Sequence, residues 1–295
     1  HLYTYDLDVF GDYSLFQYIN RTSTPVGKQH LADWFNAHLE LKESIEQRQE
    51  AIRELSTDLE YRQQIRLFGL LYKGKPADTN EIREWAGSPS YYRKHTLLRI
   101  IPTVVSIINL ICIGSAIVGI LPATVPGGVF FCFVIFSSIF SKGITKLQAT
   151  YGKKLQILST YADQILLTEK KEMNSPVLQQ LKTELTSQNQ TASQAVRQLS
   201  KLMNALDQRS NLLMSTILNG LIFWELRQVM RIEKWKETHA SDLPRWIETI
   251  GEIDAYCSLA TFTYNHPDYI FPKISSQSFH LRAEALGHPL MNRNK

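Results

Sequence analysis

One uncharged stretch decides the fold: Ile100–Ser141, which reads IIPTVVSIINLICIGSAIVGILPATVPGGVFFCFVIFSSIFS. It contains 42 consecutive residues without Asp, Glu, Lys or Arg and is rich in Ile, Val, Leu and Phe. A membrane-spanning helix needs about 20 apolar residues, and Ile101–Leu121 supplies that length without a charge. The segment Pro122–Gly128 that follows contains two prolines and two glycines, which mark a turn. We therefore predict an apolar helical hairpin.

The second limb of this hairpin is expected to be short. Val129–Ser141 has 13 residues, which extend roughly 20 Å as a helix and fall short of a hydrocarbon core of about 30 Å. The limb would have to recruit the turn, tilt its partner, or let Lys142 and Lys146 snorkel. The alternative is a hairpin buried in a helical core or at an oligomer interface. Membrane insertion is favoured because a domain of this size can hardly cover so long an uncharged stretch.

Positive charge is concentrated around the hairpin. The chain of 295 residues carries a net charge of only +4, yet no acidic residue lies between Glu84 and Asp163. Five basic residues flank the uncharged stretch directly: Arg93, Lys94, Arg99, Lys142 and Lys146. Both flanks lie at the same end of a hairpin, so the positive-inside rule places both ends of the chain in the cytoplasm. The predicted location is cytoplasmic, attached to the inner face of a membrane.

Outside the hairpin the hydrophobic pattern is helical, so we predict a mainly α fold. Thr24 before Pro25 is typical of a helix start, and Ile45–Leu59 carries one apolar stripe on a single long helix. The longest periodic segment begins after Ser175 and meets no Gly or Pro until Gly220, which predicts a rod of about 65 Å. The polar run Thr186–Ser193 is the place where this rod could break.

The search for catalytic and metal-binding motifs is negative. The eight histidines and three cysteines are scattered without metal-type spacing. Gly69–Lys75 has the spacing G-x-x-x-x-G-K, but Pro76 follows where a phosphate-binding loop needs Ser or Thr. We expect no catalytic residue, metal ligand or cofactor within these residues. Composition, with 44% hydrophobic and 20% charged residues, is that of a globular protein and excludes a disordered chain.

Charged residues on the predicted helices have two interpretations. Five basic residues are candidate contacts for DNA phosphates: Lys170, Lys171, Arg197, Lys201 and Arg209. Glu169, Glu172 and Asp207 lie among them, so an ordinary charged surface is the favoured interpretation. Further along, four acids are interspersed with four basic residues and predict a solvated helix face: Glu225, Glu233, Glu237 and Asp242 with Arg227, Arg231, Lys234 and Lys236.

Phrases at the two ends of the chain carry a family resemblance. Near the start, Asp8–Phe16 is followed by Ile19–Lys28 and by Leu31–Trp34. Near the end, Ile250–Ala260 reads IGEIDAYCSLA, and Leu286–Leu290 reads LGHPL. In this order the phrases resemble the core region of the MutS family of DNA mismatch-repair ATPases. The first set is similar to the family's G-S-L, L-N-x-T-x-T and G-x-R-x-L phrases, and the second to I-x-x-L-D-x-x-x-S-L-A and R-H-P-L.

Two features depart from the family pattern. Asp12 and Tyr13 separate Gly11 from Ser14 in the G-S-L phrase, and Gln29 stands where Arg is usual. The apolar hairpin interrupts the region in which the family has soluble core and lever helices. The chain therefore resembles a divergent, membrane-associated member of the family, and mismatch specificity does not follow from the resemblance.

The resemblance implies a division of the chain and a function. Residues 1–92 and 237–285 would form a helical core around the hairpin at 93–146 and lever helices at 147–236, and residues 286–295 would begin an ATPase domain. The module would couple ATP-driven motion of that domain to clamping of double-stranded DNA, as a homodimer. ATP and Mg²⁺ are expected in the domain beyond Lys295, so the residues present should not hydrolyse ATP themselves.

The hairpin keeps a second function open. It suggests a membrane-anchored helical scaffold, or a mechanical ATPase subunit, that acts on a protein partner without DNA. In that interpretation the long helices contact the protein partner. Duplex binding and lipid binding are the two properties that separate these hypotheses.

Overall fold

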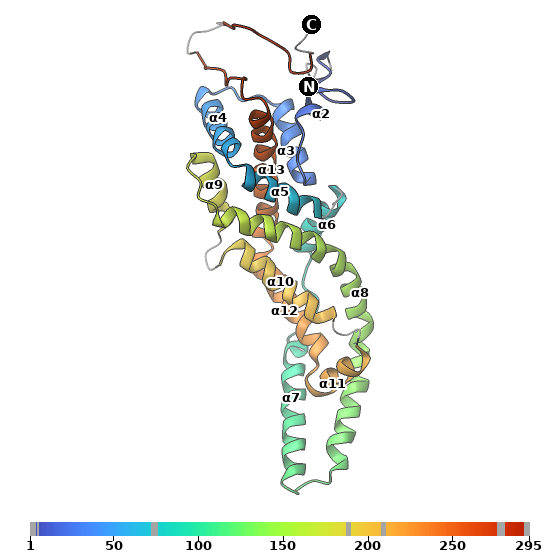
Figure 1. Ribbon diagram of the computed structural model, residues 1–295. Coiled ribbons are helices and arrows are strands. Elements are labelled where there is room, and N and C mark those ends of the chain that lie inside the picture. The colour runs from blue at the N-terminus through green and yellow to red at the C-terminus, as the bar shows by residue number, and fades with distance from the viewer. Residues whose placement is uncertain are drawn as a thin grey trace. The chain divides into compact units, whose positions relative to one another are not determined.

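The computed structural model describes residue 4 and residues 6–71, 76–186, 190–207, 211–275 and 281–291. These residues form helices, and no strand is found among them, which confirms the predicted mainly α fold (Figure 1). In chain order the helices are α2 (Leu15–Ile19), α3 (Pro25–Asn36), α4 (Lys42–Thr57), α5 (Leu59–Leu71), α6 (Pro76–Gly87), α7 (Thr96–Ile117), α8 (Thr124–Lys170), α9 (Pro176–Glu184), α10 (Ala192–Asp207), α11 (Leu212–Ile222), α12 (Trp224–His239) and α13 (Asp242–Asn265).

The chain folds into two compact units, each built from segments that are distant in sequence. The first, which we call the core unit, comprises His1–Thr79, Thr160–Ser193 and Arg245–Lys295. The second, the hairpin unit, comprises Asn80–Ser159 and Gln194–Pro244. The division expected from the family resemblance, with its boundaries at residues 92, 146, 236 and 285, stays a prediction.

The predicted apolar hairpin is present, but its turn lies earlier than expected. Helix α7 ends at Ile117 and α8 begins at Thr124, so the turn occupies residues 118–123. Pro126 and the two glycines after it lie in the first turns of α8, where proline costs little because the first N–H groups of a helix have no intrahelical partner. The second limb reaches 25 residues, Thr124–Gln148, because it recruits Thr124–Gly128 of the expected turn and includes Lys142 and Lys146, which is one of the ways foreseen for a short limb.

Two predicted long helices are broken, and in both cases polar side chains bond to the backbone at the break. The prediction of one uninterrupted helix after Ser175 is wrong. The predicted break within Thr186–Ser193 is confirmed, because α9 ends at Glu184 and α10 begins at Ala192. There the backbone N–H of Ser193 donates to the carboxylate of Glu169 (3.0 Å). The helix predicted over Ile45–Leu59 is interrupted at Asp58, whose side chain accepts from the N–H of Tyr61 (2.9 Å) as an N-cap of α5.

The core unit is organised around the carboxylate of Asp254 on α13, which is only 1% exposed. It accepts hydrogen bonds from the N–H of Ser23 (2.9 Å) and the N–H of Thr24 (2.8 Å). The hydroxyls of the same two residues donate to it at 3.2 and 2.8 Å. One turn later on α13, Ser258 accepts from the N–H of Arg21 (2.8 Å) and donates to the carbonyl of Ile19 (2.9 Å). The two end phrases of the sequence therefore dock directly on each other.

Close backbone approach makes this docking possible. Thr24 is the N-cap of α3, as predicted, because its side chain accepts from the N–H of Gly27 (3.0 Å). A Cβ at Gly27 would overlap Asp254, and a Cβ at Gly251 would overlap Val26. Helices α3 and α13 can thus meet only because both positions lack a side chain.

At about pH 4, where the contribution of this group is complete, we expect Asp254→Asn to destabilise the protein by about 2–4 kcal/mol. The new amide group would face four hydrogen-bond donors with only one acceptor oxygen in a buried site. Chemical unfolding followed by circular dichroism measures the loss. The same change at the exposed Asp12 should stay within about 0.5 kcal/mol, and an equal loss for both variants would contradict this role for Asp254.

The stability of the core unit should also depend on pH through this group. Burial raises the pKa of Asp254 to about 6 from its ordinary value of 3.8, although the bonds from Thr24 and Ser23 oppose the increase. Because the folded protein then holds the proton more tightly than the unfolded chain, the stabilisation by this group is complete below about pH 4 and is lost as the pH rises through about 6. The free-energy advantage of the wild type over Asp254→Asn should therefore shrink between pH 4 and 7. An advantage that grows over this range would refute the assignment.

Candidate functional site

The exposed apolar hairpin is the most unusual surface of the hairpin unit. Thr96–Ile117 and Thr124–Gln148 are long and apolar enough to cross a membrane, and none of the apolar window in the second is buried. Side chains such as Ile111 (60% exposed) and Ile135 (70% exposed) face outward. In Figure 1 the two helices extend from the turn that joins them toward the same side, as a hairpin does. A core helix of a soluble protein would bury such residues, so this large exposed apolar surface marks an interaction site.

Helix α11, which the sequence analysis did not identify, packs against this hairpin. Gly220 of α11 lies so close to Phe130 and Val134 of α8 that a Cβ would overlap them. The buried amide of Asn109 on α7 donates to the carbonyls of Gly220 and Leu221, both at 3.0 Å. Helix α11 was not expected as a separate element, because most of its 11 residues lie inside the predicted rod, which stops before Gly220.

Helix α11 also exposes apolar side chains. Leu212 is 80% exposed and Leu213 is 79% exposed, and Met214 and Ile217 beside them are about half exposed. Leu212–Ile222 is apolar but too short to span a bilayer. Helix α11 therefore adds to the exposed apolar side chains of the hairpin unit.

The junction between α11 and α12 is closed by an aromatic cluster and an arginine. Phe223 has a φ of 51°, in the left-handed region, and its buried ring lies 5.8 Å from that of Phe136. The guanidinium of Arg227 donates to the carbonyls of Ile222 (3.0 Å) and Pro102 (2.8 Å). Carbonyl groups at the end of α11 are thereby satisfied inside an apolar surrounding, as backbone groups away from water require.

The charged face predicted for residues 225–242 is only partly solvated. Arg231 and Lys234 are exposed as expected, but Glu225, Glu233 and Lys236 are each at most 5% exposed, so the prediction is wrong for these three. They are buried because each has partners from a distant segment or a neighbouring helix. A usable signal was their position on the same helix face as apolar residues that are also buried.

Glu233 organises the segment that leads into α7. Its carboxylate accepts the backbone N–H groups of Tyr91 (2.9 Å), Tyr92 (3.1 Å) and Arg93 (2.7 Å). Three N–H donors converging on one buried carboxylate form a strong charge-assisted cluster. The base of the hairpin is therefore fixed to α12.

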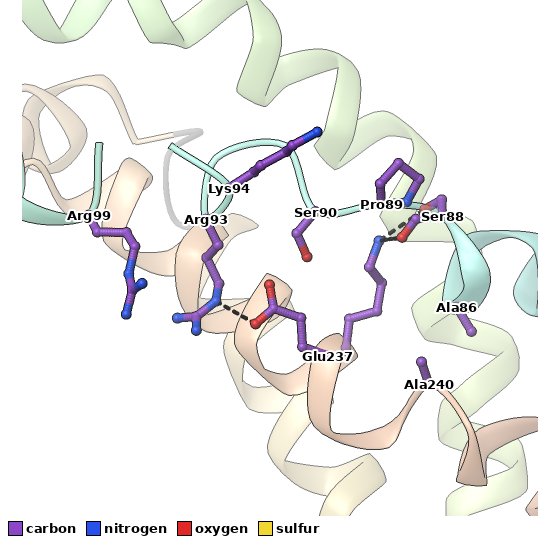
Figure 2. Close-up of a pocket in the computed structure, with 10 residues that line it drawn as sticks. Ala86, Ser88, Pro89, Ser90, Arg93, Lys94, Arg99, Glu237 and Ala240 are labelled. Carbon is purple, nitrogen blue, oxygen red and sulfur yellow. Dashed lines mark hydrogen bonds and ion pairs between the residues drawn. The ribbon is translucent and has the colours of Figure 1, made fainter. Parts of the chain in front are cut away.

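A basic cavity of about 600 Å³ lies at this base (Figure 2). The predicted flanking residues Arg93, Lys94 and Arg99 line it together with Lys236 and Glu237 from α12. Arg93 forms an ion pair with Glu237 (Nε–Oε2, 2.8 Å). Burial would raise the pKa of Glu237, but the hydrogen bond from Arg93 and the charges of Arg93 and Arg99 keep it below its ordinary value. Glu237 is therefore ionised and partly offsets the positive charge.

The remaining flanking residues and the candidate DNA contacts are distributed over both units. Lys142 and Lys146 are exposed on α8 in the hairpin unit. In the core unit, Lys170 is exposed at the end of α8, whereas Lys171 forms an ion pair with Asp58 (2.6 Å). Arg197 and Lys201 are exposed one turn apart on α10 in the hairpin unit, and Arg209 lies outside the described residues. The structure thus brings together two pairs of these cations, each in a different unit.

The described residues contain no cluster of metal-ligating side chains. No group of three or more His, Cys, Asp or Glu side chains among them could hold a metal ion. Gly69, part of the phosphate-loop spacing, lies within α5, and a Cβ there would overlap Ser23. That glycine has a packing role, since it lets α5 approach the docked N-terminal phrase.

Removal of the Glu233 carboxylate should loosen the base of the hairpin. We expect Glu233→Ala to increase the rate of trypsin cleavage after Arg93 or Lys94 by about tenfold or more, because three backbone N–H groups lose their acceptor. Mass spectrometry of the fragments identifies the sites. Glu84→Ala, at an exposed position of α6, serves as the control and should leave the rate unchanged. Equal rates in both variants would contradict the proposed anchoring role.

A comparison with protein-family models supports the family resemblance of the two end phrases. MutS domain III matches residues 4–260, which include the core helices, the apolar hairpin and most of α13. Searches of the curated proteins and of the solved structures gave no match. Because the match extends over most of the chain, the resemblance inferred from the end phrases is confirmed, and the chain belongs to the MutS domain III family.

Proposed function

We propose that this chain is the core and lever module of a MutS-like, DNA-binding ATPase of the mismatch-repair type. The family match over residues 4–260 carries this proposal. ATP and Mg²⁺ would bind in a C-terminal domain, and its motion would pass through α13 to the longer helices that hold double-stranded DNA. Hydrogen bonds of Asp254 and Ser258 on α13 with Thr24 and Arg21 support this path of motion, because they join the N-terminal segment of the core unit to α13. The functional form would be a homodimer.

DNA contact by Arg197 and Lys201 is the most direct part of this proposal to test. They lie four residues apart on one face of α10, a spacing that suits neighbouring phosphates. We expect full-length protein to bind duplex DNA, and Arg197→Gln/Lys201→Gln to lower the slope of log K against log salt by about 2. Fluorescence anisotropy at several salt concentrations measures this.

The control for the DNA experiment is a matched pair on α12. Arg231→Gln/Lys234→Gln removes the same two charges from exposed positions and should leave the slope unchanged. Absence of duplex binding by the wild type, even at low salt, would overturn the DNA proposal. Equal slopes for the two variants would remove Arg197 and Lys201 as contacts.

The exposed hairpin favours a second proposal, attachment to the inner face of a membrane. The most apolar part of α8 has no buried residue, and α11 adds the exposed side chains of Leu212 and Leu213. At about 25 cal/mol per Å², the burial of such side chains in lipid is strongly favourable. A membrane-anchored scaffold that acts on a protein partner would need this surface and would not need DNA.

Flotation with liposomes tests the attachment. We expect full-length protein to float with phosphatidylcholine vesicles, and deletion of Ile100–Ser141 to abolish flotation because the apolar spans are removed. Circular dichroism of the deletion variant checks that the remaining helices are folded. A wild type that stays in the aqueous fraction would refute attachment, whereas flotation without any duplex binding would favour the scaffold over the DNA module.

A further inference from the structure

We propose that the basic cavity at the base of α7 binds the phosphate group of an anionic lipid. This inference rests on the proposed insertion of the hairpin in a membrane. The residues that would act on the phosphate are Arg93, Lys94, Arg99 and Lys236. The other polar residues of the lining are Ser88, Ser90 and Glu237. Figure 2 shows Arg93 directed at the Glu237 carboxylate, with the Arg99 side chain extending beside it in the same direction.

The charges around the cavity are not balanced within the protein. Four cationic side chains line it with one carboxylate, Glu237, which is paired with Arg93. The neighbouring Glu233 carboxylate is engaged by three backbone N–H groups. Even when both acids are counted, the cations outnumber them by four to two. An anion of one or two charges, such as a phosphate monoester or diester, would neutralise this excess.

Lys236 is the buried cation of the cavity, and its hydrogen bonds go to uncharged oxygens. It is 5% exposed, and its ammonium group donates to the carbonyl (2.6 Å) and the hydroxyl (2.9 Å) of Ser88, which are both neutral oxygens. Burial lowers the pKa of Lys236, although the charges of Glu233 and Glu237 oppose the decrease. A partly desolvated ammonium gains from a charged acceptor, because charge-assisted bonds are about twice as strong as neutral ones.

The start of α7 adds to the positive character of the site. His95 is its N-cap residue but makes no side-chain capping bond, and the first turn contains no acidic residue. The N-terminus of a helix carries a partial positive charge, and Arg99 adds a full one within the first turn. Lys94 lies only two residues before the helix begins.

Position along the hairpin decides between possible sources of phosphate. The cavity residues Lys94 and Arg99 flank the first residue of the first apolar span, Thr96. If α7 crosses a bilayer, its first turn lies at the level of the lipid headgroups, where phosphates are concentrated. A lipid phosphate is therefore available at this cavity at high local concentration, whereas free phosphate and DNA must reach it from solution.

The experiment uses full-length protein in micelles of a neutral detergent and follows the thermal unfolding midpoint. Short-chain phosphatidic acid is the probe, short-chain phosphatidylcholine the uncharged comparison, and inorganic phosphate and duplex DNA are the soluble arms. We expect saturable stabilisation by phosphatidic acid that is at least tenfold weaker in apparent affinity for Lys94→Gln/Arg99→Gln. Both side chains are exposed, so the variant should fold. Arg231→Gln/Lys234→Gln, with the same loss of charge outside the cavity, should remain within twofold of the wild type.

Each other result overturns the proposal. Equal affinities for both variants would show that the lipid acts elsewhere, and equal stabilisation by phosphatidylcholine would show that charge is not recognised. Stabilisation by inorganic phosphate or DNA at concentrations at which phosphatidic acid has no effect would identify a different ligand. Flotation with phosphatidylcholine vesicles separates this outcome from the membrane proposal, because Lys94→Gln/Arg99→Gln retains the whole hairpin and should still float.

Discussion

The core unit depends on one buried carboxylate, that of Asp254. It gathers four donors from Ser23 and Thr24, two consecutive residues that lie about 230 positions earlier in the chain. The same bonds hold Thr24 where its hydroxyl can cap α3, so one interaction fixes both the start of a helix and its packing partner. Asp254 and Ser258 are one helical turn apart, which is why both reach the same loop. The spacing D-x-x-x-S in the family phrase thus has a direct physical meaning.

The hairpin unit is held together by a different constraint, which is the satisfaction of backbone groups next to apolar surface. Helix α11 ends among apolar side chains of α7 and α8, where its last carbonyls cannot be solvated. Asn109 and Arg227 supply the missing donors. Each is a polar residue that a simple hydropathy profile would count against membrane insertion. In the structure they make the apolar surroundings tolerable for an interrupted helix, since they leave no carbonyl at the junction without a partner.

Local signals were sufficient to predict part of this structure. The cap at Thr24, the apolar hairpin and the break before α10 follow from neighbouring residues, and the structure confirms them. The turn was misplaced because Pro126 is equally compatible with a turn and with the first turn of a helix. The helix face of Glu233 and Lys236 pointed to their burial, but their partners at residues 88–93 could not be predicted, since these lie about 140–150 positions away. Charged residues are expected to face water unless a specific partner is known, and sequence periodicity does not reveal that partner.

Helix α8 connects the two proposed functions. Its first 25 residues form an apolar membrane-type span, and its last part packs in the core unit, where Gln164 donates to the carbonyl of Ile65 (2.9 Å) and Thr168 pairs with the hydroxyl of Tyr61 (3.0 Å). One continuous helix therefore contributes residues to both units. The apolar span that the membrane proposal needs and the bonds that hold the core unit together thus lie in different parts of this helix, so the hairpin leaves intact the residues that join the two ends of the core unit.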